Sequence, residues 1–396
     1  MNDDEQRAPG AGIVVVGSGI AGATAAQTLR AEGFTGPVTL VGAEARLPYR
    51  RTALSKDLLA ADLSPGRITL KPAEFWAERD IEVIGGAAVR DIDAAGASIL
   101  LDDGTELGYR ALILATGARP IRPSWLDDDV FALRTVADAE RIRSAITDSG
   151  SLVVIGGGLI GLELAASAAG AGLAVTVLES ADRVMNRVVP AEVSEHLAQL
   201  HRSHGVDLRL GARVVGASSN RVECLDGTVV EGTVVAAVGA APNVTLAEAA
   251  GASIGSGGGI VVDGALRTTV ERIYAAGDAA AVPDPVSGDP MRGEHWFGAL
   301  DQGAAVAHSV LADLVGEPAP VFAEVPRAWT VQYGVNMQMV GRPDLDGEVA
   351  VDGDPVNEAT VTVTRDGRLV GAVTLGRAAA ARALRARLAD NAGAPV

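Results

Sequence analysis

The feature that most constrains this fold is a G-x-G-x-x-G pattern that occurs twice, 139 residues apart. The first copy begins at Gly17 after the apolar run 13–16, and the second begins at Gly156 after the run 152–155. In such a pattern the first glycine turns a strand into a helix, the second lets the backbone approach a pyrophosphate, and the third lets helix and strand pack closely. Because both copies close a β-branched run and open an alanine-rich segment, the sequence predicts two strand–helix–strand motifs that each bind a dinucleotide.

Each motif is completed by a second apolar run that ends in a carboxylate. Glu44 lies 27 residues beyond Gly17, and Glu179 lies 23 residues beyond Gly156. A carboxylate at this position accepts hydrogen bonds from ribose hydroxyls. A negative charge there also repels the 2′-phosphate of NADPH, so Glu179 predicts a preference for NADH. Two bound dinucleotides in one chain imply electron transfer between them.

The similarity between the two halves extends beyond the glycines. Each half continues with short strands around a hairpin signal and then with a buried strand that runs into a glycine turn. The paired segments are 102–104 and 225–228 for the hairpins, and 111–117 and 234–239 for the buried strands. A further strand, 273–279, ends in Gly-Asp, and alternating residues from about 323 onward precede a helix expected at 377–389. The predicted fold class is α/β, with two Rossmann-like dinucleotide-binding domains and a small α+β C-terminal domain.

Composition narrows the classes of function. The formal net charge is −17, which argues against nucleic acid or an acidic membrane as a partner. Cys224 is the only cysteine, so no C-x-x-C redox pair exists, and we interpret it as a buried side chain. The N-terminal residues are acidic and lack the basic stretch of a secretory signal, which leads us to expect a cytoplasmic protein.

Three of the five histidines fall on a helix expected at 191–204. At 3.6 residues per turn His201 and His204 share a face, whereas His196 lies about 140° away from His201. No cysteine or second ligand pair completes a tetrahedral metal site. We therefore interpret the cluster as a solvated helix face and expect no metal ion.

The order of motifs along the chain resembles the FAD-dependent, NADH-linked ferredoxin reductases, the family of putidaredoxin reductase, rhodocoxin reductase and the reductase components of aromatic-ring dioxygenases. The resemblance covers roughly residues 11–375 and rests on GSGIAG, LPYRRTALSK, LILATGARP, VVIGGGLIGLELA, VGAAPN and IYAAGD, in this order. It implies a glutathione-reductase-like fold. The implied domains are a discontinuous FAD-binding domain of residues 1–122 and 245–322, an NAD-binding domain of residues 123–244, and a C-terminal α+β domain of residues 323–396.

The resemblance also implies roles for individual residues. FAD would be bound by the first glycine pattern, its carboxylate, the Thr-Gly turn and the Gly-Asp box: Gly17, Gly19, Gly22, Glu44, Thr116, Gly117 and Asp278. NADH would be bound by Gly156, Gly158, Gly161 and Glu179. Further contacts to FAD are implied for Arg51, Lys56 and Trp296. The implied catalytic residues beside the flavin and the nicotinamide are Lys56, Glu163, Trp296 and Trp329.

Three segments depart from the family pattern where an electron acceptor or a substrate would approach. Val331 stands in place of an acidic residue, Thr52-Ala53 follows Arg51 in place of prolines, and His295-Trp296-Phe297 adds bulk. Ferredoxins are generally acidic, so docking on a chain with a net charge of −17 requires a local basic patch. The candidates for this patch are Arg46, Arg50 and Arg51.

The main hypothesis is an NADH-dependent oxidoreductase in which FAD passes electrons to a [2Fe–2S] ferredoxin that supplies a cytochrome P450 or a Rieske oxygenase. One alternative is an FAD- and NADH-dependent enzyme that acts directly on a small molecule in a biosynthetic pathway. The other is a redox-sensing interaction protein like apoptosis-inducing factor. We expect a monomer or a weak homodimer.

Overall fold

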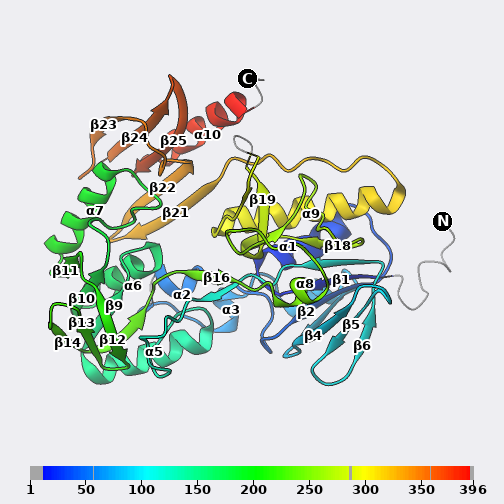
Figure 1. Ribbon diagram of the computed structural model, residues 1–396, viewed down its shortest axis with the longest axis horizontal. Coiled ribbons are helices and arrows are strands. Elements are labelled where there is room, and N and C mark those ends of the chain that lie inside the picture. The colour runs from blue at the N-terminus through cyan, green and yellow to red at the C-terminus, as the bar shows by residue number, and fades with distance from the viewer. Residues whose placement is uncertain (1–11, 57, 285–287, 357, 393–396) are drawn as a thin grey trace. The chain divides into compact units, whose positions relative to one another are not determined.

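The computed structural model describes residues 12–56, 58–284, 288–356 and 358–392 (Figure 1). These residues form two compact units. The first unit contains the described residues of Met1–Arg50, Ser64–Arg119 and Ala241–Glu324, and the second contains those of Arg51–Leu63, Pro120–Ala240 and Val325–Val396. The limits of the three expected domains stay a prediction, and their outer ends, residues 1 and 396, lie outside the described residues.

A five-stranded parallel sheet forms the centre of the first unit, in the order β18-β7-β1-β2-β3. Its strands are β1 (Ile13–Val16), β2 (Val38–Gly42), β3 (Ile81–Gly85), β7 (Ala111–Leu114) and β18 (Ile273–Ala275). All residues of β1 and β7 are buried. Such continuous apolar runs are what a parallel sheet covered on both faces requires.

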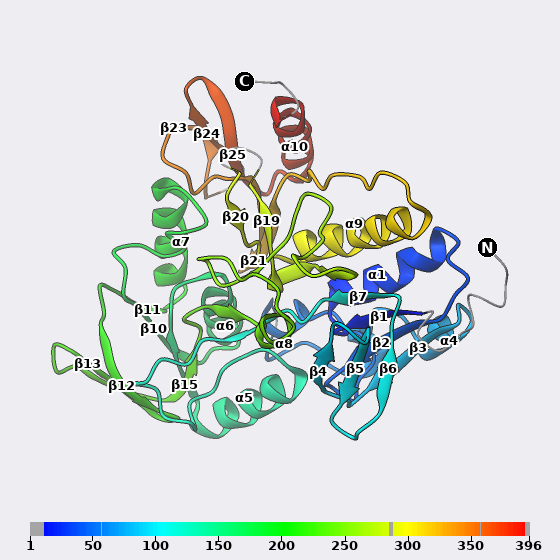
Figure 2. The same cartoon turned by 45° about the vertical axis from the view of Figure 1, so that its right-hand side comes forward.

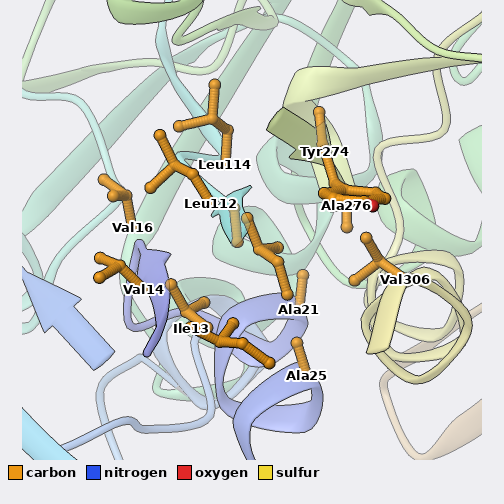
Figure 3. Close-up of a cluster of buried hydrophobic side chains, with 14 of the residues drawn as sticks. Ile13, Val14, Val16, Ala21, Ala25, Leu112, Leu114, Tyr274, Ala276 and Val306 are labelled. Atoms are coloured by element: carbon orange, nitrogen blue, oxygen red, sulfur yellow. The ribbon is translucent and has the colours of Figure 1, made fainter. Parts of the chain in front are cut away.

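Two helices of the first unit, α1 (Ile20–Ala31) and α9 (Trp296–Val315), pack against each other and against strands of this sheet. Figure 3 shows Ala21 and Ala25 of α1 and Val306 of α9 in one buried cluster with side chains of β1 and β7. Gly303 of α9 permits this close approach, because a Cβ at its position would lie only 2.3 Å from the carbonyl oxygen of Ala21. This packing fixes the first turn of α1 beyond the end of β1.

The remaining elements of the first unit are small. An antiparallel sheet is formed by β4 (Val89–Asp93), β5 (Ser98–Leu101) and β6 (Glu106–Gly108), and another sheet by β17 (Ile260–Val261), β19 (Ala280–Pro283) and β20 (Pro290–Met291). The pairing of β5 with β6 confirms the hairpin predicted at 102–104. The short helices are α3 (Pro65–Ile68), α4 (Ala73–Ala77), α8 (Thr245–Ala249) and the 3-10 turn η1 (Gly277–Ala279).

A four-stranded parallel sheet forms the centre of the dinucleotide-binding part of the second unit, in the order β11-β10-β9-β15 (β9 is labelled in Figure 1 and β15 in Figure 2). Its strands are β9 (Ser151–Ile155), β10 (Ala174–Glu179), β11 (Asp207–Leu210) and β15 (Thr233–Ala236). Four helices accompany them: α2 (Ala53–Lys56), α5 (Val136–Ser149), α6 (Leu159–Gly170) and α7 (Ala191–Ser203). The order strand, helix, strand, meander and strand thus repeats that of the first unit, as the sequence predicted.

The antiparallel meander of the second unit consists of β12 (Val214–Ser218), β13 (Arg221–Cys224) and β14 (Val229–Glu231). The pairing of β13 with β14 confirms the second predicted hairpin. Cys224 is buried, as expected. The short strands β8 (Ala118–Pro120) and β16 (Ala240–Pro242) form a separate two-stranded sheet.

The C-terminal part is an antiparallel sheet with one helix, which confirms the α+β prediction. The sheet has the order β21-β22-β25-β24-β23. Its elements are β21 (Arg327–Gln332), β22 (Val335–Gly341), β23 (Glu348–Asp354), β24 (Glu358–Arg365), β25 (Arg368–Leu375) and α10 (Ala378–Ala392). α10 packs on β22 and β25 and is longer than the helix expected at 377–389. Throughout the described chain, no helix is long and apolar enough to cross a membrane.

Candidate active site

Both glycine patterns form the same turn between a parallel strand and a helix. The Gly17 N–H donates to the Val41 carbonyl oxygen at 2.8 Å, and the Gly156 N–H donates to the Leu178 carbonyl oxygen at the same distance. Gly17 has a φ of +113° and Gly156 a φ of +111°. Side chains are strained at such angles, so glycine is required at the first position of each turn.

The available space distinguishes the three glycines of the first turn. An ideal Cβ on Gly17 would lie 2.0 Å from the Ala115 carbonyl oxygen, and one on Gly22 would lie 1.9 Å from the Gly17 carbonyl oxygen. A Cβ on Gly19, in contrast, would meet no atom within 4 Å. The first and third glycines therefore allow the chain to pack on itself, whereas the middle one faces open space.

The second turn has the same construction. A Cβ on Gly156 would lie 2.5 Å from the Ala237 carbonyl oxygen and one on Gly161 would lie 2.0 Å from the Gly156 carbonyl oxygen, whereas one on Gly158 would meet nothing within 4 Å. Gly19 and Gly158 each precede the first turn of a helix that has no side-chain cap. Open space in front of uncapped helix N–H groups is what a pyrophosphate requires. The two turns therefore fit two dinucleotides.

Both expected ribose-binding carboxylates are held by donors of this chain. Glu44 follows β2, and its Oε2 accepts a hydrogen bond from the buried Tyr49 hydroxyl at 2.9 Å. Glu179 ends β10, and its carboxylate accepts from the Gly157 N–H at 2.6 Å and from the Ala181 N–H at 2.7 Å. The Glu179 carboxylate is thus fixed at the glycine turn. The sequence analysis did not identify Tyr49.

Two further segments lie at the first glycine turn. The Thr116 hydroxyl donates to the Asn243 carbonyl oxygen at 2.6 Å, and Thr116 directly follows the residue whose carbonyl oxygen faces Gly17. Gly277 packs on the first turn of α1, because a Cβ on it would lie 2.9 Å from the Ala21 Cβ. Asp278 follows Gly277 and is half-buried. The structure therefore brings together in the first unit the expected FAD residues Gly17, Gly19, Gly22, Glu44, Thr116, Gly117 and Asp278.

A buried ion pair joins α2 to α6 in the second unit. Lys56 Nζ lies 2.5 Å from Glu163 Oε1, and Glu163 is 2% exposed. The Ser55 hydroxyl donates to the other carboxylate oxygen, Glu163 Oε2. The Thr330 hydroxyl donates to Glu163 Oε1 at 2.7 Å. One buried carboxylate therefore accepts hydrogen bonds from three side chains, of which sequence analysis identified only Lys56.

Trp329 holds the other side of Lys56. Lys56 Nζ lies 4.6 Å from the centre of the Trp329 ring and donates to the Trp329 carbonyl oxygen at 3.2 Å. A cation over an aromatic face is attracted by the ring quadrupole. Lys56, Glu163 and Trp329 thus form one cluster in the second unit, whereas Trp296 is the first residue of α9 and belongs to the first unit.

The three candidate docking arginines differ in their surroundings. Arg46 and Arg50 are exposed residues of the first unit, and the Arg50 guanidinium donates to the Arg67 carbonyl oxygen at 2.6 Å. Arg51 is half-buried in the second unit, and its guanidinium donates to the Arg134 carbonyl oxygen at 2.8 Å.

The interpretation of the histidines as a solvated helix face is wrong for His201. This side chain is 0% exposed, and its ring lies between Gln332 Oε1, 2.8 Å from Nε2, and the Tyr333 hydroxyl, 2.9 Å from Nδ1. His196 is half-buried, and His204 is exposed and stacked on Tyr333. Helical periodicity predicts which residues share a face of the helix. Which face is buried depends on the segments, distant in sequence, that pack on the helix. Within the described ranges, no group of ligand-type side chains is arranged to hold a metal ion.

A signal for the missed residues is present in β21. Ala328, Thr330 and Gln332 are buried at alternate positions, whereas Val331 is exposed. Polar side chains on the buried face of a strand need hydrogen-bonding partners. The alternation therefore marks Thr330 and Gln332 as members of a buried polar network, although it does not name their partners.

The burial of His201 makes folding stability depend on pH. Desolvation holds the pKa of His201 at about 4, below its ordinary value of 6.5. Between these pH values the unfolded chain binds a proton at His201 and the folded chain does not. The stabilising contribution is therefore complete above pH 6.5 and is lost as pH falls towards 4, by about 3 kcal/mol over the whole window.

Denaturant unfolding of the wild type and of His201→Gln at several pH values measures this effect. The variant should lose less stability than the wild type between pH 6.5 and pH 4. The matched control is His308→Gln, because the His308 side chain is 42% exposed. Equal slopes for the wild type and His201→Gln would contradict the prediction.

Comparison with known proteins supplies the family. The chain matches the model of the pyridine nucleotide-disulphide oxidoreductase family over residues 11–303 and that of a reductase C-terminal domain over residues 327–395. A ferredoxin–NAD(+) reductase component of 3-phenylpropionate/cinnamic acid dioxygenase, from Photorhabdus laumondii, is 34% identical over 96% of each chain. Rhodocoxin reductase of Rhodococcus erythropolis is 40% identical over 83% of this chain and 78% of its own.

A solved structure is similar along the same length. A chain of the covalent putidaredoxin reductase–putidaredoxin complex is 33% identical, has a TM-score of 0.89, and is matched over 96% of this chain and 93% of that chain. These similarities confirm the resemblance and the α/β fold class with a C-terminal domain that the sequence predicted. The chain belongs to the ferredoxin–NAD(+) reductases of the pyridine nucleotide-disulphide oxidoreductase family.

Proposed function

We propose that this protein is a ferredoxin–NAD(+) reductase that holds FAD in its first unit and takes NADH at its second. Its electrons would pass to a [2Fe–2S] ferredoxin that supplies a cytochrome P450 or a Rieske oxygenase. The observation that carries the proposal is the pair of glycine turns, each with open space at its middle glycine. The names of the relatives and the complex of a similar reductase with putidaredoxin support a ferredoxin as partner.

In the first unit, the turn from Gly17 to Gly22 would hold the pyrophosphate of FAD, and Glu44 would accept hydrogen bonds from its adenosine ribose. Thr116, Gly117 and Asp278 lie at the same turn and would contact the rest of the cofactor. FAD, when bound, accepts a hydride from NADH and releases the two electrons singly. The protein's part in that chemistry is to bind and orient the two dinucleotides and to exclude water.

In the second unit, Gly156, Gly158 and Gly161 would hold the pyrophosphate of NADH, and Glu179 its adenosine ribose. The Glu179 carboxylate accepts hydrogen bonds from two backbone N–H groups, so it is fixed in position. A fixed negative charge cannot turn away from a 2′-phosphate. NADH is therefore the proposed substrate in preference to NADPH.

Hydride transfer needs aligned rings and no acid or base on the protein. Lys56 is held by the Glu163 carboxylate, by the Trp329 carbonyl oxygen and by the Trp329 ring. A cation fixed in this way stabilises negative charge that develops beside it without reorganising. We assign Lys56, Glu163, Trp296 and Trp329 to the redox site, and Arg51 to a contact with FAD.

An acidic ferredoxin needs a positive patch on a chain of net charge −17. We propose Arg46, Arg50 and Arg51 as that patch, since two of them are exposed. We further propose that the protein works in the cytoplasm as a monomer or a weak homodimer.

An anaerobic titration of the purified protein tests the function. The visible flavin band should bleach rapidly with NADH and slowly with NADPH. Glu179→Ala should narrow this preference about tenfold, which corresponds to about 1.4 kcal/mol of lost repulsion. The matched control is Glu192→Ala, an exposed acid at the start of α7 that should leave the preference unchanged.

A second arm adds a [2Fe–2S] ferredoxin and follows reduction of cytochrome c. The ferredoxin should accelerate turnover with NADH. If no ferredoxin does so although NADH bleaches the flavin, the acceptor assignment is wrong, and direct action on a small molecule becomes the leading function. If NADH does not bleach the flavin, the reductase proposal fails altogether.

A further inference from the structure

A continuous chain of hydrogen bonds leads from the buried Glu163 to His201 in the last turn of α7 and on to Tyr333, which follows β21. Thr330 Oγ1 lies 2.7 Å from Glu163 Oε1, and Gln332 Nε2 lies 3.2 Å from Thr330 Oγ1. His201 Nε2 lies 2.8 Å from Gln332 Oε1, and the Tyr333 hydroxyl lies 2.9 Å from His201 Nδ1. All five side chains belong to the second unit.

The middle of this chain is inaccessible to water. The exposed fractions are 1% for Thr330, 2% for Gln332 and 0% for His201. Buried polar groups are costly unless each finds a partner. Here each polar side chain finds its partner within the hydrogen-bond chain itself, so removing one side chain leaves its neighbours without a partner.

The donors can be assigned from one end of the chain to the other. The Glu163 carboxylate only accepts, so the Thr330 hydroxyl donates to it and in turn accepts from the Gln332 amide nitrogen. The Gln332 oxygen is then left to accept from His201 Nε2–H, and His201 Nδ1 accepts from the Tyr333 hydroxyl. A pKa of about 4 agrees with this neutral imidazole. Every hydrogen bond therefore points towards Glu163.

We propose that Thr330, Gln332, His201 and Tyr333 are positioning residues for the Lys56–Glu163 pair, an inference that rests on the proposed reductase function. Hydrogen bonds aligned in one direction polarise and strengthen one another. The last of them fixes the same carboxylate oxygen, Oε1, that binds Lys56.

Strand β21, which contributes Thr330 and Gln332 to the hydrogen-bond chain, also contacts Lys56. Thr330 follows Trp329, whose carbonyl oxygen and ring contact Lys56. A shift of β21 therefore moves both contacts of Lys56 at once. The chain orients groups and does not conduct protons, because the Gln332 amide would have to change its tautomer to pass a proton on.

Loss of this alignment should slow hydride transfer and leave NADH binding intact. A small misplacement caused by a side chain outside the reacting groups reduces rates by up to about a hundredfold. The four positioning residues lie outside the glycine turn at Gly156, and their hydrogen bonds link them to one another and to Glu163, so the affinity for NADH should not change.

Matched variants of Thr330 test the proposal. Thr330→Val keeps the shape and loses the donor, whereas Thr330→Ser keeps the donor. In single-turnover bleaching of the FAD-loaded protein by NADH, Thr330→Val should be about tenfold slower than wild type and Thr330→Ser within about twofold, with equal dissociation constants for NADH. Tyr333→Phe alone should lower the bleaching rate below that of the wild type. Added to Thr330→Val, it should lower the rate no further.

A second readout does not depend on activity. Nitrogen-15 NMR of labelled histidines should show His201 with its proton on Nε2. A proton on Nδ1 would overturn the proposal, because the direction of the chain would be wrong. A Thr330→Val protein with a lower melting temperature but the wild-type rate of flavin reduction would also overturn it. The hydrogen-bond chain would then only attach β21 to the helices. If the wild type is not reduced by NADH, the reductase function fails and the positioning role fails with it.

Discussion

Replacing Gly22 by alanine should yield protein without bound flavin, whereas replacing Gly161 by alanine should yield flavoprotein that NADH no longer reduces. A Cβ at Gly22 would lie 1.9 Å from the Gly17 carbonyl oxygen, and one at Gly161 would lie 2.0 Å from the Gly156 carbonyl oxygen. Neither α1 nor α6 can accept the added methyl group without moving away from the strand that precedes it. We expect each change to cost about 3 kcal/mol of local stability and to distort one pyrophosphate site.

The flavin-to-protein ratio after purification and the rate of bleaching by NADH measure the two effects separately. Gly19→Ala is the matched control, because its Cβ would meet no atom of the protein within 4 Å. Its unfolding without cofactor should match the wild type, while its affinity for FAD falls. Full flavin content in Gly22→Ala together with normal melting would show that the first turn is not the FAD site.

Removing the Glu163 carboxylate should have the second large effect. Glu163→Leu leaves Lys56, which is 18% exposed, without its partner. Breaking a buried ion pair in this way costs about 3 kcal/mol or more, because one charge remains without compensation. The rate of flavin reduction by NADH should fall about a hundredfold, since the orientation of Lys56 is lost.

The double variant Lys56→Met/Glu163→Leu separates stability from function. Replacing both charges by apolar groups should restore the melting temperature towards that of the wild type. The rate of flavin reduction should stay low, because no cation remains in the site. If the double variant regained the wild-type rate, the pair would only be a structural contact.

Local sequence was sufficient for the parts of the fold in which a few neighbouring residues decide the geometry. The turns at Gly17 and Gly156 and the two hairpins formed as predicted, and β10 ends at Glu179 as expected, whereas β2 ends at Gly42, two residues before Glu44. Each depends on backbone angles, steric room or strand periodicity within a short segment. The residues that we propose for FAD come together in the first unit because they follow the ends of neighbouring parallel strands.

The cluster of Lys56, Glu163 and Trp329 could not be derived from local patterns. Lys56 and Glu163 are 107 residues apart in sequence, and Lys56 and Trp329 are 273 apart. Family resemblance named these residues, but it did not identify Ser55 or Thr330 as donors to Glu163. No periodicity within a helix or a strand specifies which distant element packs on it.

His201 shows the limit most clearly. Its position on α7 was predictable from helical periodicity, and its burial was not, because Gln332 and Tyr333 at the end of β21 cover it. The sequence by itself determined the two dinucleotide turns, the carboxylates after them and the absence of a cysteine pair. The tertiary structure alone decided that the described residues of Arg51–Leu63 pack with the second unit and that a chain of hydrogen bonds ends on Glu163. Turn chemistry acts over a few residues, whereas the burial of polar groups depends on contacts between segments that are far apart in the chain.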